Sequence, residues 1–142
     1  MPDILHELSI NAPIDRVFAA IGSREGLSDW WTTTTSGDSA PGQTLTFTFG
    51  THSIDMRVDA LEKPGHIAWQ CTREGPEWLG TKITFDLSPK EGRTLLRFGH
   101  RGWAETGRSF AHCNMRWAMF LLSLRELVET GKGRPFPYAL PI

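Results

Sequence analysis

Strict alternation of apolar and polar residues runs through most of the chain. The clearest example is the segment 44–50, where Leu45, Phe47 and Phe49 share one parity and three threonines take the other. A period of two places successive side chains on opposite faces, so the pattern predicts a strand with one buried face. Similar alternation predicts strands at 3–10, 53–62 and 66–72, and a hairpin within 80–103.

A helical period follows the first strand. Pro13 suits a first helical position, and apolar residues recur behind it at steps of three and four, so a short amphipathic helix is predicted. Gly22 is expected to end this helix. The stretch 27–30 then allows one further helical turn.

Two adjacent tryptophans, Trp30 and Trp31, precede four threonines. We expect the helical turn to end near Asp29 and a strand to begin at this pair, which would turn the two indoles to opposite faces of a sheet. We favour Trp30 as the inner one because Thr32 and Thr34 share its parity. A slip of one residue would exchange the two roles, so the sequence leaves this choice open.

The longest helical pattern lies near the end of the chain. From Arg108 to Thr130 there is no Pro or Gly, and apolar residues recur every three or four positions, which predicts a long amphipathic helix. Gly131 is expected to end it. The proline-rich tail 131–142 is expected to pack as an extended strap or to fray.

The predicted order is one strand, two short helices, six strands and one long helix. An antiparallel sheet with a single apolar face needs a cover, and the C-terminal helix is the element long enough to provide it. We therefore predict one α+β domain over residues 1–142, in which a curved antiparallel sheet wraps around the long C-terminal helix.

Several stretches resemble a known superfamily along nearly the whole chain. They are INAPIDRVFAAI at 10–21, LSDWW at 27–31, GTKITFDLSP at 80–89, TLLRFGHRGW at 94–103 and MRWAMFLLSLRELVETGKGRPFP at 115–137. The sequence resembles the helix-grip fold of the START-like (Bet v-like, SRPBCC) superfamily, and within it the AHSA family, named after the activator of the heat-shock-protein-90 ATPase. The superfamily includes polyketide cyclases and lipid-transfer domains, so the resemblance implies a cavity between sheet and helix and leaves its contents open.

The parity of the strands and of the long helix nominates the walls of that cavity. A concave, mostly apolar space with a few polar groups is the usual form of a small-molecule site. The predicted ligand-binding residues are Trp30, Phe47, Phe49, Met56, Trp69, Phe85, Phe98, His100, Phe110, Asn114, Trp117 and Leu121. The alternative is that these side chains fill the interior themselves and leave no cavity.

His100 is the candidate for acid–base chemistry. It shares the inner parity with Phe98 near a strand end, where a buried imidazole can move a proton or hydrogen-bond a ligand. The alternative is a histidine held by a backbone or loop group. Asn114 could bind a ligand or a neighbouring backbone group, and Arg101 and Arg108 could receive an anionic group or stay solvated.

Composition narrows the function classes further. Fifteen basic and sixteen acidic residues give a net charge of −1 without a basic stripe, so no nucleic acid is expected as a partner. No segment has the roughly 20 apolar residues of a bilayer span, and the N-terminus lacks the pattern of a secretory leader, so we expect a cytoplasmic protein. Cys71 and Cys113 fit buried thiols, and the histidine spacing fits no metal triad, so we expect no metal and no cofactor.

These observations support three hypotheses. The leading one is binding of a small hydrophobic or aromatic ligand between the sheet and the C-terminal helix. The second is a cofactor-free cyclase or isomerase that uses His100 in the same cavity. The third is a chaperone-interacting module, as the family name implies. The exposed edges of the sheet are also compatible with a homodimer.

Overall fold

The fold is built on one antiparallel sheet of seven strands in the order β1-β7-β6-β5-β4-β3-β2. The computed structural model describes residues 1–73 and 77–142. The strands are β1 (Ile4–Ile10), β2 (Thr34–Gly37), β3 (Thr44–Phe49), β4 (His52–Glu62), β5 (His66–Arg73), β6 (Lys82–Lys90) and β7 (Arg93–Arg101), and the helices are α1 (Ile14–Gly22), α2 (Arg24–Trp30) and α3 (Arg108–Thr130).

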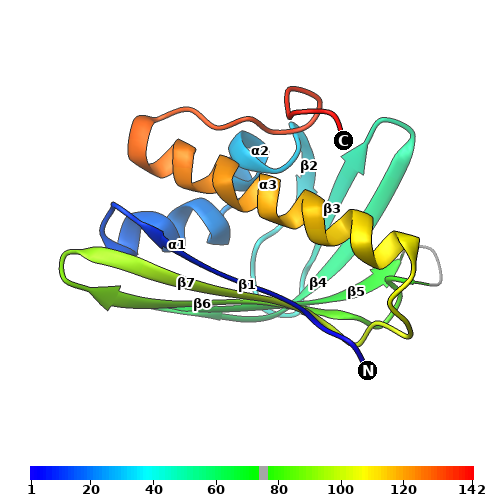
Figure 1. Ribbon diagram of the computed structural model, residues 1–142. Helices are drawn as coiled ribbons and strands as arrows, with labels where there is room; N and C mark the ends of the chain where they lie inside the picture. The colour runs from blue at the N-terminus through cyan, green and yellow to red at the C-terminus, as the bar shows by residue number, and fades with distance from the viewer. Residues whose placement is uncertain (74–76) are drawn as a thin grey trace.

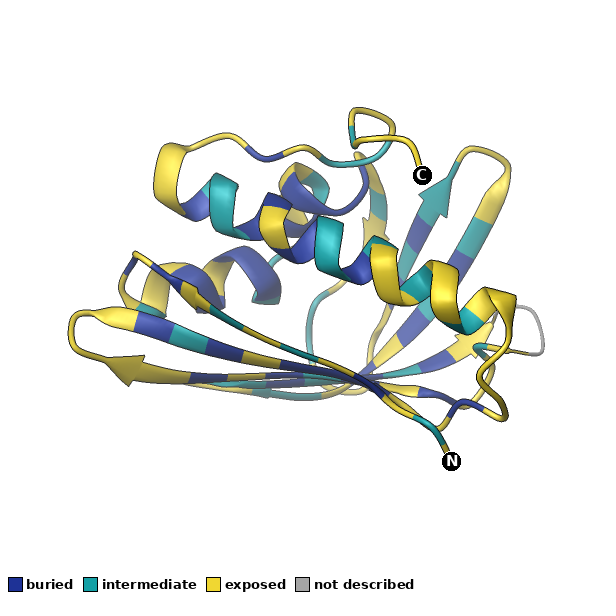
Figure 2. Cartoon of the chain, in the orientation of Figure 1, coloured by how far each residue is buried: buried dark blue, intermediate teal, exposed yellow. Residues whose placement is uncertain are grey.

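The long helix α3 lies across the concave face of the curved sheet, with α1 below its C-terminal half and α2 behind it in the view of Figure 1. Burial alternates along the strands (Figure 2), as expected for a sheet that is covered by helices on one face. The helix has the predicted bounds and ends at Gly131 in the left-handed conformation, with φ of 92°. The predicted helix-grip architecture is therefore confirmed, because the alternating strands bury one row of side chains against one long helix.

The local prediction for the tryptophan pair is wrong. Trp30 ends helix α2, Trp31 caps it by donating its backbone N–H to the carbonyl of Leu27, and the next strand begins only at Thr34. Ser23 caps the N-terminus of α2, and its hydroxyl accepts a hydrogen bond from a backbone N–H of the first turn. Side chains along α2 then follow the helical spacing of three and four residues. Both indoles are consequently buried, and they stack at 6.1 Å between ring centroids.

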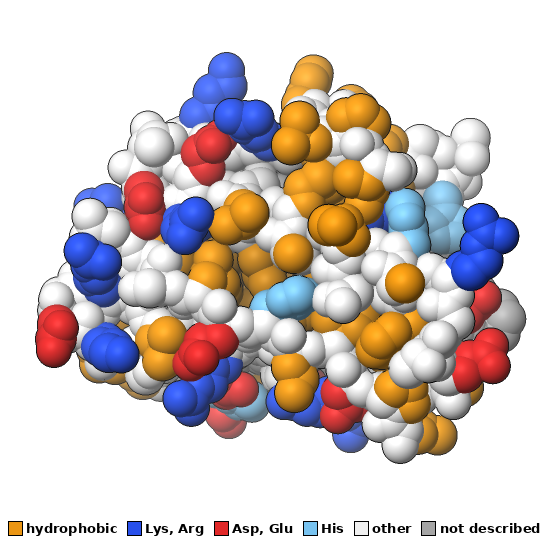
Figure 3. All heavy atoms as spheres, viewed as in Figure 1, with side chains coloured by type: hydrophobic (Ala, Val, Ile, Leu, Met, Phe, Trp, Pro, Cys, Tyr) orange, Lys and Arg blue, Asp and Glu red, His pale blue; other side chains and the backbone are white. Residues whose placement is uncertain are grey.

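The C-terminal tail runs back along α3 toward the end of α2 (Figure 1). The backbone N–H of Arg134 donates to the Ser123 hydroxyl at 2.7 Å, and that of Phe136 donates to the carbonyl of Trp31 at 2.8 Å. Hydrophobic side chains gather over the tail and the middle of α3 on the surface seen in Figure 3. The exposed ones on these two segments are Met115, Leu122, Tyr138, Leu140 and Ile142.

Candidate functional site

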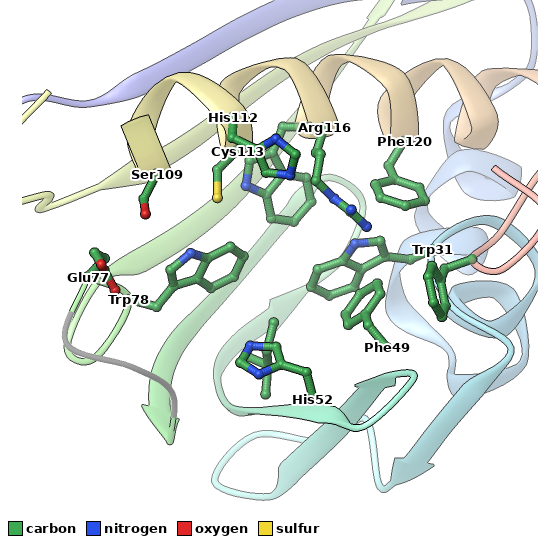
Figure 4. Close-up of a pocket in the computed structure, with 13 residues that line it drawn as sticks. Trp31, Phe49, His52, Glu77, Trp78, Ser109, His112, Cys113, Arg116 and Phe120 are labelled. Atoms are coloured by element: carbon green, nitrogen blue, oxygen red, sulfur yellow. The ribbon is translucent and has the colours of Figure 1, made fainter. Parts of the chain in front are cut away.

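A pocket of about 510 Å³ lies between the N-terminal half of α3, the β3–β4 hairpin and the connection that precedes β6 (Figure 4). Its described lining residues are Trp31, Phe49, His52, Ile54, Glu77, Trp78, Ser109, His112, Cys113, Arg116, Trp117, Phe120 and Phe136. The volume is in the range of small-molecule sites, which are about 300–1,000 Å³. A cavity between sheet and helix is thus present, although it lies toward one end of the helix.

Three tryptophans form the main apolar surfaces of this pocket. Trp117 comes from α3 and lies 4.9 Å from Trp31 and 6.3 Å from Trp78 between ring centroids. Trp31 reaches the pocket because α2 ends immediately before it, and Trp78 because it stands in the connection before β6. At these separations the three indoles contact one another and form one continuous aromatic wall, and the parts of it that border the space can contact a planar ring.

Arg116 supplies a positive charge to the pocket wall. It is half-buried, and its guanidinium carbon lies 5.8 Å from the ring centroid of Phe49 and 5.3 Å from that of Phe120. Burial lowers the pKa of Arg116, and the nearby Cys113 acts in the opposite direction. A guanidinium remains charged at neutral pH despite such a shift. The aromatic pocket therefore carries one half-buried cation.

The remaining polar side chains lie around the pocket, and they come from separate elements. His52 begins β4, Glu77 stands next to Trp78, and Ser109 and His112 lie in the first two turns of α3. No group of three or more His, Cys, Asp or Glu residues able to hold a metal ion occurs in the described ranges 1–73 and 77–142.

His100 lies beside the pocket without lining it, and both of its ring nitrogens are hydrogen-bonded. Trp117 can only donate from Nε1, so His100 Nδ1 accepts that bond at 3.1 Å and the proton resides on Nε2, which lies 2.8 Å from the Thr81 hydroxyl. Thr81 in turn donates to the carbonyl of Trp78 at 2.5 Å. Burial lowers the pKa of His100 to about 3. The imidazole is therefore neutral and held in one tautomer, which argues against its predicted role as acid or base.

The hydrogen bonds of His100 indicate a structural role beside the pocket. It joins Trp117 on α3 to the connection that carries Trp78, and so fixes two of the three indoles. In this arrangement His100 acts as a positioning residue, because both of its ring nitrogens are engaged by side chains from other elements.

Only two of the twelve predicted ligand-binding residues, Phe49 and Trp117, line the pocket. Among the others, Phe110 is half-buried against Trp103, and Asn114 is exposed, with its backbone carbonyl 3.3 Å from the His6 ring. Besides His100, those that fill the core next to the pocket are Trp30, Phe47, Met56, Trp69, Phe85, Phe98 and Leu121. In this structure these side chains pack in the core and do not border the pocket.

Trp31 replaces Trp30 as the tryptophan of the pair that lines the pocket. Trp30 instead lies fully buried, and its Nε1 donates to the carbonyl of Ala20 at 3.0 Å. The sequence pattern did not predict several other lining residues. The spacing along α3 could have indicated some of them. Cys113, Arg116 and Phe120 follow a helical spacing that includes Trp117, so the face of α3 toward the sheet carries an arginine.

The sequence also matches a family model. The model of activator of Hsp90 ATPase homolog 1-like proteins covers residues 11–129. The chain belongs to this family. No curated protein matches it in sequence. For this member of the Hsp90-ATPase-activator-like family, none of the described helices is both long and apolar enough to cross a membrane.

Solved structures agree with the family assignment. The Aha1 dimer from Colwellia psychrerythraea is 38% identical, with a TM-score of 0.87 over 94% of this chain and 100% of that one. The protein MLL2253 from Mesorhizobium loti is 21% identical, with a TM-score of 0.79 over 90% and 97% of the two chains. CalU16 from Micromonospora echinospora is 20% identical, with a TM-score of 0.75 over 89% and 73%. The last two similarities establish the shared fold.

Proposed function

We propose that this protein binds a small, mainly apolar ligand with aromatic character in the pocket at the N-terminal half of α3. The observation that carries this proposal is a space of about 510 Å³ bordered by Trp31, Trp78 and Trp117. Aromatic contacts contribute about 0.5–1.5 kcal/mol each beyond the burial of their area, so three indoles provide a strong preference for a planar apolar ligand.

A neutral fluorescent probe tests pocket binding without involving charge. We expect phenyl-naphthylamine to bind the wild-type protein with enhanced emission. Cys113→Trp adds an indole to the pocket wall and should abolish the enhancement, whereas Met115→Trp adds the same indole to an exposed position of the same helix and should preserve it. Enhancement that is absent in wild type, or equal in both variants, would overturn the proposal.

Thiol chemistry provides an independent readout of the same pocket. Cys113 lines the pocket, whereas Cys71 is buried, with 1% of its surface exposed. We expect iodoacetamide to modify Cys113 much faster than Cys71, and the bound probe to slow the reaction at Cys113 alone.

Native mass spectrometry of gently purified protein tests the same pocket for a ligand acquired in the cell. Extra mass that is present in the native protein and released on denaturation would report such a ligand.

We also propose that two copies of the chain associate. The Colwellia psychrerythraea structure, 38% identical, is a dimer, and here the exposed Leu122 and Leu140 border a shared groove between α3 and the tail. Leu122→Glu should then yield a monomer in light scattering, whereas Leu79→Glu, which replaces another exposed leucine, should not. A monomeric wild type would refute the proposal.

Chaperone binding stays a prediction that the family name motivates.

A further inference from the structure

Arg116 differs from the arginines of this protein that form surface ion pairs. Arg73, for example, lies 2.6 Å from an Asp55 oxygen and Arg134 lies 3.0 Å from a Glu126 oxygen, both on the surface. Arg116 is half-buried, and within residues 1–73 and 77–142 no carboxylate lies at ion-pair distance from it. Removing a charge from water without a counter-ion is unfavourable.

The two phenylalanine rings offset only part of that cost. Phe49 and Phe120 lie at cation–π distances, and such contacts engage the faces of the guanidinium plane. The five N–H donors lie along its edges. No side-chain or backbone acceptor for them is found among the described residues. Arg116 thus has unused donors on a wall of the aromatic pocket (Figure 4).

The other charged group of the pocket stands apart from Arg116. Glu77 is the one acidic side chain among the described lining residues, and it lies beside Trp78 on the far side of the space (Figure 4). The pocket therefore has an asymmetric charge distribution, because its cation and its carboxylate lie at different ends. A ligand with a negative group would be oriented by both.

We propose that the pocket selects planar aromatic carboxylic acids, whose carboxylate pairs with the edge of the Arg116 guanidinium while the ring lies against Trp31, Trp78 and Trp117. A guanidinium presents two parallel N–H donors that match the two oxygens of a carboxylate, and such charge-assisted pairs are about twice as strong as neutral hydrogen bonds. This inference rests on the proposed function and adds to it the class of ligand.

A matched pair of ligands tests the charge preference in the unmodified protein. Naphthalene carboxylate and naphthalene carboxamide have nearly the same shape, and calorimetry near neutral pH measures both affinities. We expect the carboxylate to bind at least about tenfold more tightly than the amide. Equal affinities would overturn the selectivity and leave pocket binding standing, whereas no binding of either compound would overturn both proposals.

Variants then assign the preference to Arg116. Arg116→Gln should weaken carboxylate binding by about tenfold or more and amide binding much less, because the amide carbonyl accepts only a neutral hydrogen bond, so the preference disappears. Arg116→Lys keeps the charge without the paired donors and should retain an intermediate preference. Arg125→Gln removes the same charge from the same helix outside this pocket and should change neither affinity.

Circular dichroism establishes that each variant is folded before its affinities are interpreted. If Arg116→Gln does not fold, Arg116→Lys and the wild-type ligand pair still decide the matter. An equal loss of carboxylate and amide binding in Arg116→Gln would make Arg116 a packing residue and overturn the inference.

Discussion

The two halves of α3 follow one amphipathic pattern and yet have different surroundings. Six residues between Trp117 and Thr130 are buried, whereas none is buried from 108 to 116, a segment that the structure describes completely. The C-terminal half packs on α1 and α2, as the bond from the Ser123 hydroxyl to the carbonyl of Trp30 illustrates. Neither of the other two described helices lies under the N-terminal half, and the pocket lies there beside it.

This difference shows that the residues that stabilise the fold and those that border the pocket lie at opposite ends of α3. A closed core forms where three helices meet the sheet, so the other end of the same helix can leave room for a ligand. Trp117 stands at the boundary: it is 2% exposed, it lines the pocket, and it is anchored by His100. Substitutions should therefore become less costly from the boundary toward the helix start.

The largest effect is expected for Trp117→Ala. Removing this indole leaves a cavity and deprives His100 Nδ1 of its donor, so the free energy of unfolding should fall by about 3–5 kcal/mol. Phe110→Ala, at a half-buried position about two turns earlier, should cost well under half of that. Urea unfolding measures both, and equal losses would remove the contrast between the two halves.

The next effect is a pH dependence that His100 imposes. Its pKa is lowered by burial from 6.5 to about 3, so between these values the unfolded chain binds a proton that the folded chain does not. Above pH 6.5 His100 does not lower the free energy of unfolding. Below pH 6.5 this one group lowers it by about 1.4 kcal/mol per pH unit, or by about 2–3 kcal/mol at about pH 4.5.

A variant without the imidazole isolates this contribution. His100→Gln should be less stable at neutral pH, because it disturbs the bonds to Thr81 and Trp117, and should lose the slope between pH 6.5 and about 4.5. Asp55 titrates below that window, because the hydrogen bond from Arg73 lowers the pKa of its carboxyl. An identical slope in wild type and variant would show that other groups cause the dependence.

A smaller loss is expected at Ser123 in the closed half. Its hydroxyl donates to the carbonyl of Trp30 and accepts from the backbone of Arg134, so it joins α3, α2 and the tail. Ser123→Ala should destabilise the protein by about 1–2 kcal/mol in thermal or urea unfolding. Thr130→Ala removes an exposed hydroxyl from the same helix and should cost less than about 0.5 kcal/mol. Similar costs would mean that the tail is held by other contacts.

Most of the fold follows from periodicity alone. The two-residue alternation around Phe47 and the unbroken helical pattern from Arg108 to Thr130 each extend over several turns or pleats, so local errors cannot reverse them. Trp30 and Trp31 lie where a helix becomes a loop, and there a shift of one residue changes the element. Hence the predicted strand, with one indole facing inward and the other outward, is wrong, and both indoles are buried at the end of α2.

The candidate site could be predicted only in part, for a physical reason. Parity indicates which side of a strand faces the interior, but it does not tell whether neighbouring side chains meet or leave a gap. Phe85 and Phe49 share the inner face, yet Phe85 is fully buried against Trp30 while Phe49 borders the pocket. The difference arises from the side chains that other elements pack against each ring, which is a property of tertiary structure that strand parity does not contain.

The smallest effect is expected at Met115 in the open half, where 60% of the side chain is exposed. Met115→Ala should change the free energy of unfolding of the monomer by less than about 0.5 kcal/mol, since little apolar surface is buried there. If two chains associate through the outer face of α3, the same substitution should instead lower the melting temperature in a way that depends on protein concentration. A large loss independent of concentration would mean that the first turns of α3 are packed as tightly as the last.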